Sequence, residues 1–228
     1  MDLVDGVRDL RFPFAEYGYR ELFVFSSGFC LMALLSGYFV WPPLAVPFAL
    51  LALFVFWFFR DPHRAVPPDE SAVVSPADGT VTDITELDDA EFIGGPALRI
   101  GIFLSVLSVH INRAPCAGVV AYIRYHKGKF LNAMRAESSS DNESNSVGMT
   151  LPSRGDRKIL VKQITGAIAR RIVCTCEPGD QLARGQKFGM IKFGSRTELF
   201  VSRDLPFVAA VKIGQKVHAG SSVIGRFE

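Results

Sequence analysis

The chain lacks an excess of charge of either sign, because its 25 Lys and Arg residues are matched by 23 Asp and Glu residues. Nucleic-acid binding needs a basic surface, so this balance argues against nucleic acid as a partner. The sequence also lacks metal-binding cysteine spacing, a glycine-rich nucleotide loop and the G-x-S-x-G turn of hydrolases. We therefore expect no metal site, no nucleotide site and no serine hydrolase.

Cysteine is scarce, with only Cys30, Cys116, Cys174 and Cys176 in 228 residues. Cys174 and Cys176 are two residues apart, so on a strand they would lie on one face. No pair has the C-x-x-C spacing, and we expect all four to be reduced and packed. Reduced cysteines favour a cytosolic setting for the globular part of the chain.

Charge is missing altogether from residues 22–59, a run almost twice as long as one membrane-spanning helix needs. Trp41, Pro42 and Pro43 stand in its middle, and two prolines break a helix. We predict two hydrophobic helices folded as a hairpin, with both ends in the cytoplasm because Arg20 and Arg60 flank the run. Its length and acidic flank argue against a cleaved signal peptide. A hairpin that only dips into one leaflet stays open.

The remaining chain has the pattern of short strands and turns, which predicts a β-rich globular domain over residues 65–228 after a membrane-anchoring segment over residues 1–64. A weak repeat begins at Gly179 and again at Gly214, and each copy predicts a turn, a strand and a further turn. Paired units of this kind resemble the half-barrels of lipoyl- and biotinyl-type domains. We expect a mainly β, lipoyl-like barrel or sandwich. The polar segment 137–157 is expected to be a mobile loop.

Three residues are candidates for chemistry. Ser195 follows Gly194 inside a predicted strand, His110 ends an apolar strand, and Asp78 stands in the turn "SPADG". Taken singly, each is more often structural: a core histidine, an Asp-Gly turn and a common dipeptide. Taken together they could form a relay in which the aspartate orients the histidine and the histidine deprotonates the serine. Spacing alone does not show that they meet.

Six segments in order carry a family resemblance: "SPADGTV", "FLSVLSVHINRAP", "HKGKFLNA", "DNESN", "IARRIV" and "GQKFGMIKFGSR". Together they resemble the phosphatidylserine decarboxylase proenzymes, most closely the short form that is called archaeal-type and also occurs in bacteria. The resemblance runs from about Arg60 to the C-terminus, and the hydrophobic leader fits it too. Any one segment would be weak, but six in the right order are specific.

The resemblance implies that the proenzyme cuts itself between Gly194 and Ser195, giving a large chain (1–194) and a small chain (195–228). Ser195 would become a pyruvoyl group, which takes the serine amine of the lipid as a Schiff base and accepts the electrons of decarboxylation. The products would be phosphatidylethanolamine and CO2. It further implies that Asp78 orients His110, and that His110 is the base for cleavage and a candidate proton donor. Membrane phospholipid is the expected substrate, at the cytoplasmic side of the cell membrane.

The sequence departs from the longer bacterial and mitochondrial branch at two positions. Arg196 follows the serine where that branch has Ser or Thr, and Arg113 stands where it has a second histidine. A two-histidine mechanism therefore does not transfer. We hypothesise that Arg113 or Arg196 holds the phosphate or carboxylate of the substrate, since a guanidinium fork matches either anion. A packing or surface arginine is an equal alternative at each position.

Two other functions compete with this interpretation. A membrane hairpin with a lipoyl-like domain would suit an adaptor or transport accessory protein, which has no reason to cut itself. A pyruvoyl decarboxylase for a soluble amino acid would not need the hydrophobic segment. The sequence leaves a homo-oligomer open. It also leaves open whether "DNESN" forms a lid over the site or a plain solvated loop.

Overall fold

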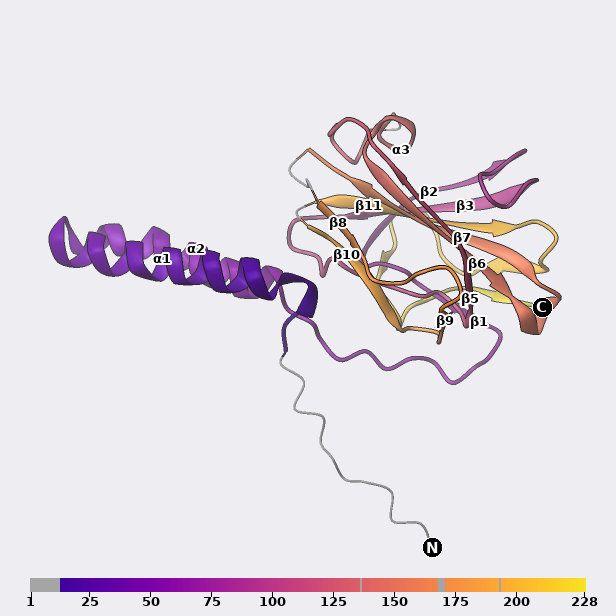
Figure 1. Cartoon of the computed structure of the whole chain (residues 1–228), viewed down its shortest axis with the longest axis horizontal. Helices are drawn as coiled ribbons and strands as arrows, with labels where there is room; N and C mark the ends of the chain where they lie inside the picture. The colour runs from indigo at the N-terminus through magenta and orange to yellow at the C-terminus, as the bar shows by residue number, and fades with distance from the viewer. Residues whose placement is uncertain (1–12, 136, 168–170, 193) are drawn as a thin grey trace, which may run out of the picture. The chain divides into compact units, whose positions relative to one another are not determined.

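A computed structural model of the chain describes residues 13–135, 137–167, 171–192 and 194–228. The chain divides into two compact units, Met1–Pro62 and His63–Glu228. The described part of the first unit is mainly helical, and the second is built from strands (Figure 1).

The helical unit is a hairpin. After the short helix η1 (Glu16–Gly18), α1 (Tyr19–Phe39) and α2 (Ala45–Phe58) pack against each other, with the 3₁₀ turn η2 (Pro42–Leu44) between them. Prolines begin η2, where the missing N–H groups cost no helical hydrogen bond. At the base, the N–H of Ala15 donates to the carbonyl of Phe59 at 2.7 Å, so the two ends of the hairpin lie together.

The hairpin exposes its apolar side chains, including Phe23, Leu34 and Leu53. Among the described residues, Glu16–Phe39 is the one helix long and apolar enough to cross a bilayer by length and composition. The 14 residues of α2 extend only about 21 Å at about 1.5 Å each, less than the roughly 30 Å of a hydrocarbon core. These features support membrane association of the hairpin.

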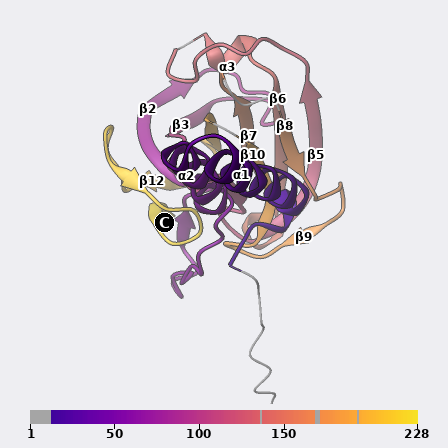
Figure 2. The ribbon, with the colours of Figure 1, turned by 90° about the vertical axis from the view of Figure 1, so that its left-hand side faces the viewer.

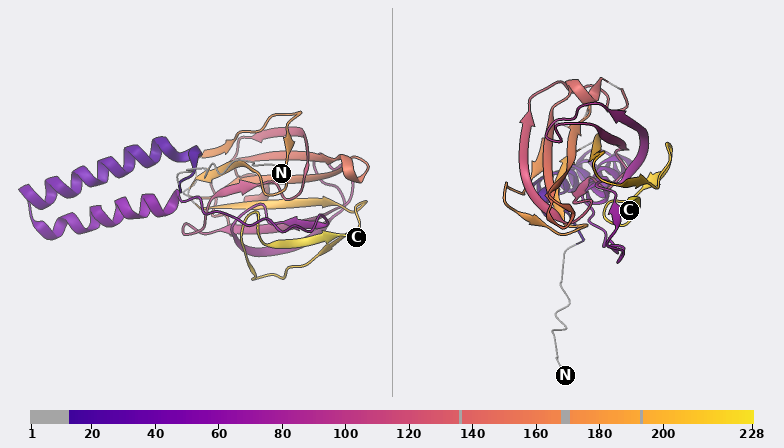
Figure 3. Two further views of the ribbon diagram at one scale, coloured as in Figure 1. Left: turned by 90° about the horizontal axis from the view of Figure 1, so that it is seen from below. Right: turned by 90° about the vertical axis from the view of Figure 1, so that its right-hand side faces the viewer.

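An antiparallel eight-stranded sheet dominates the second unit. Its order is β13 (Lys216–Val217), β2 (Gly79–Leu87), β3 (Ala97–Leu104), β11 (Ser195–Ser202), β7 (Arg157–Thr165), β6 (Ser144–Leu151), β5 (Gly118–His126) and β9 (Gln181–Leu182). The sheet curls round the core like half of a barrel (Figure 3). The prediction of a mainly β fold with an apolar helical hairpin is confirmed.

Two three-stranded sheets close the curl. One has the order β1 (Ala72–Val74), β14 (Val223–Phe227) and β12 (Phe207–Ala209), and the other β4 (Ile111–Arg113), β10 (Lys187–Lys192) and β8 (Arg171–Cys174). The main core lies between the three sheets, where Ile100, Ile102 and Leu199 of the large sheet join one cluster with Val73 and Phe188. Burial of these apolar side chains is the main stabilising term for such a domain.

The outer face of the large sheet is also covered near its middle. Residues Ala90, Ile93, Leu160 and Phe200 form a second buried cluster there. Every residue of β11 is buried as a result. The strand that begins at Ser195 is therefore central in the sheet and covered on both faces.

The predicted repeat is a structural repeat. In each copy a two-residue strand, β9 or β13, precedes a longer strand, β10 or β14. Gly179 and Gly185 in the first copy, and Gly214 and Gly220 in the second, all have positive φ. Glycine adopts this conformation without the steric cost that other residues meet, which explains the recurring glycines.

The expectation of a mobile loop over 137–157 is wrong for most of the segment. It contains α3 (Ser138–Asp141), the strand β6 and the turn η3 (Pro152–Arg154). Ser144, Asn145 and Ser146 are buried in β6 despite their polarity. The side chain of Asn145 bonds to that of Gln163 at 3.0 Å, so burial does not leave its amide unsatisfied.

Candidate active site

Ser195 stands at one edge of the large sheet. It pairs with Leu104, the last residue of β3, and with Thr165, the last residue of β7. His126, the last residue of β5, pairs with Ser144, the first residue of β6. These five residues mark the site rim, where strands on this side begin or end and loops connect them (Figure 2). The bond between Gly194 and Ser195 lies at this rim.

His110 contacts the residue that precedes the serine. The N–H of Gly194 donates to Nε2 of His110 at 3.1 Å, and Nδ1 of His110 lies 2.9 Å from the carbonyl of Ser108. A carbonyl can only accept, so Nδ1 carries the proton and Nε2 is the nitrogen with the basic lone pair. The imidazole is completely buried, just before β4. The structure thus brings the predicted base to the residue that precedes the predicted scissile bond.

The Ser195 hydroxyl is buried and has no hydrogen-bond partner within the described part of the chain. A buried hydroxyl without a partner costs free energy, and such groups concentrate where chemistry needs them. Gly194 has φ of +67°, a left-handed conformation that strains any residue with a Cβ. A backbone conformation open only to glycine, next to an unsatisfied nucleophile, suits an intramolecular acyl transfer.

Gly166 makes room for the carbonyl of Gly194. A Cβ at position 166 would lie 2.5 Å from the Gly194 oxygen, too close for any contact. Sequence reasoning missed this residue, although a glycine directly after the apolar strand β7 was a usable signal.

Asp78 does not contact His110. Its Oδ2 lies 2.6 Å from Arg64 and 3.1 Å from Nδ1 of His218, and its Oδ1 accepts the N–H of Ala219 at 2.8 Å. The reason is topological: Asp78 directly precedes β2, and β13 beside it brings the 217–219 segment to the carboxylate. His218 is the histidine that Asp78 pairs with.

Arg196 points to the other face of the sheet from Ser195, as neighbouring strand residues must. Its Nε donates to Glu198 at 2.7 Å, its Nη2 to Asp83 at 2.5 Å and its Nη1 to Thr82 at 3.1 Å. Burial would lower the pKa of Arg196, but the carboxylates of Glu198 and Asp83 outweigh it and hold this pKa above its usual range. These contacts favour the packing alternative for Arg196.

Arg113 is placed at the end of β4 farther from His110. Its Nη1 donates to the carbonyl of Gly185 at 3.0 Å, and its Cδ lies against Gly220. It therefore joins the turns of the two repeat copies.

A chain of buried amides links the strands of His110 and Ser195. Asn145 donates to Gln163 at 3.0 Å, Gln163 to Asn112 at 2.9 Å, and Asn112 to the hydroxyl of Thr197 at 3.0 Å. Asn112 lies two residues after His110 and Thr197 two residues after Ser195. Asn112 and Asn145 lie in segments that carry the family resemblance, but the sequence does not show that the four side chains bond to one another, because they come from four different strands.

Asn142 holds the loop that follows β5. Its side chain accepts from the N–H of Leu131 and donates to the carbonyls of Leu131 and Thr165, all within 2.8 Å. It is buried, so "DNESN" is not a plain solvated loop. Thr165 is the pairing partner of Ser195, so the hydrogen bonds of Asn142 lie at the site rim.

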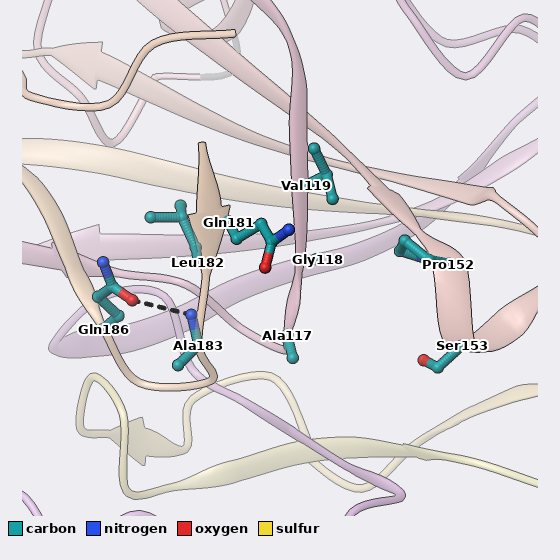
Figure 4. A pocket seen from close by; sticks show the side chains of 9 residues that line it. All are labelled: Ala117, Gly118, Val119, Pro152, Ser153, Gln181, Leu182, Ala183 and Gln186. Atoms are coloured by element: carbon teal, nitrogen blue, oxygen red, sulfur yellow. Dashed lines mark hydrogen bonds between the residues drawn. The ribbon is translucent and has the colours of Figure 1, made fainter. Parts of the chain in front are cut away.

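Two further features lie apart from this arrangement. A cavity of about 530 Å³ is bounded by Gly118, Pro152 and the 181–186 turn, where the amide of Gln186 accepts the N–H of Ala183 at 2.9 Å (Figure 4). It is lined by none of the predicted site residues.

Within the described residues, no cluster of three or more His, Cys, Asp or Glu side chains could hold a metal ion.

The cysteines are free thiols with different environments. The sulfur atoms of Cys174 and Cys176 are 3.5 Å apart. The hydrogen bond from Cys176 lowers the pKa of Cys174 to about 7, and the same bond raises the pKa of Cys176. Burial raises the pKa of Cys116 to about 12.

The fold and the site together define a class: a β-rich unit in which a buried histidine contacts the glycine of a Gly-Ser pair at the start of a central strand, preceded in the sequence by an apolar hairpin. The family model for phosphatidylserine decarboxylase matches residues 51–225 of the chain. The chain belongs to this family.

Relatives named phosphatidylserine decarboxylase proenzyme cover most of the chain. The protein from Rhodopirellula baltica is 49% identical over 216 residues, which are 95% of this chain and 89% of the relative. The one from Symbiobacterium thermophilum is 44% identical over 218 residues, 96% of this chain and 98% of the relative. The one from Carboxydothermus hydrogenoformans is 49% identical over 179 residues, 78% of this chain and 82% of the relative.

Proposed function

We propose that the chain is a proenzyme that converts phosphatidylserine to phosphatidylethanolamine and CO2. Family membership and the names of relatives up to 49% identical support this activity. The observation that carries the proposal is the Gly194–Ser195 pair, in which Gly194 has φ +67° and donates its N–H to Nε2 of His110 at 3.1 Å, while the Ser195 hydroxyl is buried without a partner among the described residues.

Self-cleavage is the first step of the proposal. The Ser195 hydroxyl attacks the Gly194 carbonyl, the C–O bond forms, the C–N bond breaks, and the nitrogen of Ser195 takes a proton. Removal of the Cα proton of Ser195 then breaks its Cβ–Oγ bond, and Gly194 leaves as a carboxylate. Water replaces the nitrogen of the resulting dehydroalanine and releases ammonia. The products are the chains 1–194 and 195–228, the second beginning with a pyruvoyl group.

His110 is proposed as the base for this step. Its basic Nε2 accepts from the Gly194 N–H, so the nitrogen contacts the residue directly before Ser195. After a rotation of the Ser195 side chain, its hydroxyl would donate to Nε2 of His110 in place of the Gly194 N–H. The amide chain through Asn112 and Thr197 would hold both strands in place while this happens.

The residues present fit a pyruvoyl group at position 195. The group is smaller than serine, loses the hydroxyl that lacks a partner, and begins a strand held on both sides. It supplies a ketone that serves as the electron sink for loss of the substrate carboxylate. His110 stays beside the group, where it can hold or deliver a proton at the reacting carbon.

The role of Asp78 is proposed in a weaker form. To orient His110, its carboxylate would have to leave Arg64 or His218, with which it is paired. Arg113 and Arg196 remain candidates for the substrate anion, but the contacts of Arg196 with Glu198 and Asp83 support a positioning role instead.

The finer assignments follow from sequence features. Arg113 and Arg196, at positions where the longer branch differs, support membership of the short branch. The length of α2, about 21 Å by helix geometry, supports a hairpin that dips into the bilayer and returns to the side from which it entered. The basic residues at its flanks support the cytoplasm as that side. The two products would stay paired as strands of one sheet, and a homo-oligomer is compatible with this arrangement.

Intact mass of the purified full chain tests the proposal, together with decarboxylation of phosphatidylserine in vesicles. We expect the wild type to give two chains split at Gly194–Ser195, the small one starting with pyruvoyl, and to release CO2. Ser195→Ala and His110→Ala should remain single, folded and inactive. An uncut wild-type chain that still decarboxylates would disprove the mechanism. An uncut, inactive but folded chain would favour a membrane-anchored adaptor.

A further inference from the structure

Exposed apolar side chains gather on two loops of the site rim. One loop, residues 105–110, joins β3 to β4, and the other, residues 127–135, follows β5. On them Leu107 is 63% exposed, Met134 66%, Phe130 38% and Val106 36%. Single exposed apolar residues are common on protein surfaces, but a group at one edge indicates an interaction surface.

The opposite rim of the large sheet offers an internal comparison. There the turns 88–96, 152–156 and 203–206 connect the same strands, and the structure describes all of their residues. None of them carries an exposed large apolar side chain. The apolar character therefore belongs to the rim of Ser195 and not to the loops of this sheet in general.

Positive charge accompanies the apolar side chains. Lys127, Lys129 and Arg135 are exposed on the 127–135 loop. Lys129 pairs with Asp141 at 3.0 Å. Basic side chains beside apolar ones are typical of surfaces that enter a bilayer interface, because the apolar groups reach the acyl chains while the charges meet lipid phosphates.

We propose that the 105–110 and 127–135 loops insert into the phospholipid bilayer, so that the β-rich unit has a membrane contact of its own in addition to the hairpin. The inference rests on the proposed function, which requires a lipid headgroup to reach position 195 while its acyl chains stay in the bilayer. A rim seated on the bilayer shortens the distance that the headgroup must travel. The hairpin alone would tether the unit but would leave the direction of the rim undetermined.

Tryptophan fluorescence tests the insertion directly in the full chain. Its only tryptophans, Trp41 and Trp57, both lie in the hairpin. In a W41F/W57F background, Leu107→Trp or Phe130→Trp supplies one reporter on each loop. Val208→Trp is the matched control, since Val208 is 51% exposed on β12 and outside both loops. Vesicles that contain brominated phospholipid quench a tryptophan that reaches the acyl chains.

We expect strong quenching at positions 107 and 130 and none at 208. Leu107→Gln combined with Met134→Gln should leave cleavage at Gly194–Ser195 complete, but should lower kcat/KM for phosphatidylserine in vesicles about tenfold, the equivalent of about 1.4 kcal/mol. For short-chain phosphatidylserine dispersed as monomers, kcat/KM should stay within about twofold.

Quenching of wild-type Trp41 without quenching at 107 and 130 would overturn the inference, because the chain would then be anchored by the hairpin alone. Equal loss of activity on both forms of the lipid would overturn it as well. Quenching does not depend on catalysis. A chain that is quenched but uncut would therefore refute the proposed function and leave the membrane contact standing, and a cleaved, active, unquenched chain would do the reverse.

Discussion

Arg196 offers the sharpest test of whether the residue after the scissile bond binds substrate or supports the fold. Its side chain is 6% exposed, and that of its partner Glu198 is completely buried. Arg196→Met would leave the Glu198 carboxylate buried with only the hydroxyl of Ser139, at 2.9 Å, as a side-chain donor. Removing one member of a buried ion pair typically costs about 3–5 kcal/mol. For a chain of this size that is a fall in Tm of roughly 6–20 °C.

The assay is thermal unfolding in detergent, with every variant made in a Ser195→Ala background so that each stays one chain. Arg196→Met, Glu198→Met and the double variant form a cycle. We expect the double variant to be about 2 kcal/mol or more stabler than the sum of the single losses predicts, because it removes both charges. A loss below about 1 kcal/mol in Arg196→Met, with a raised KM for phosphatidylserine in the cleavable form, would refute this reasoning and make Arg196 a substrate ligand.

Two further predictions concern the thiols and the carbonyl of the scissile bond. Because the pKa of Cys174 is lowered to about 7, its thiolate accumulates as the pH rises through 7. Iodoacetamide labelling, followed by peptide mass spectrometry, should therefore have its midpoint near pH 7 at Cys174, while Cys116, with a pKa of about 12, stays unlabelled. A shared labelling midpoint near pH 9 would contradict this. Gly166→Ala should slow self-cleavage about tenfold or more, since the new Cβ would displace the Gly194 oxygen. A time course of intact mass measures this rate, and Gly95→Ala, which has open space around its Cβ, is the control. Equal cleavage rates in the two variants would show that the position of the Gly194 carbonyl is not critical.

The parts of the fold set by local patterns were predictable from the sequence. The uncharged run with Pro42 and Pro43 gave the hairpin, and the recurring glycines at 179 and 214 gave the repeat. The strand β6 was missed because Ser144 and Asn145 are polar. Their burial depends on partners such as Gln163, which only the folded sheet supplies.

The site was predictable in its residue types but not in its pairings. Both His110 and His218 are available to Asp78 by chain order, and only the course of β13 beside β2 selects His218. The contact between His110 and Gly194 joins residues 84 positions apart, which spacing cannot reveal. Arg196 likewise was placed next to the serine by sequence, while the alternation of strand residues turns it to the other face.

The central position of β11 has a consequence for how the precursor folds and how the cleaved protein unfolds. Ser195 pairs on both sides, with β3 and β7, so a cut before it would leave the new chain end clamped where it was formed. The intact precursor folds as one molecule, but the cut form would unfold into two, and its reassembly would depend on concentration. Cleavage would thus make folding a single event: the covalent link between the two parts guides folding of the precursor and is then cut. The mature protein would owe its lifetime to slow unfolding and not to an ability to refold.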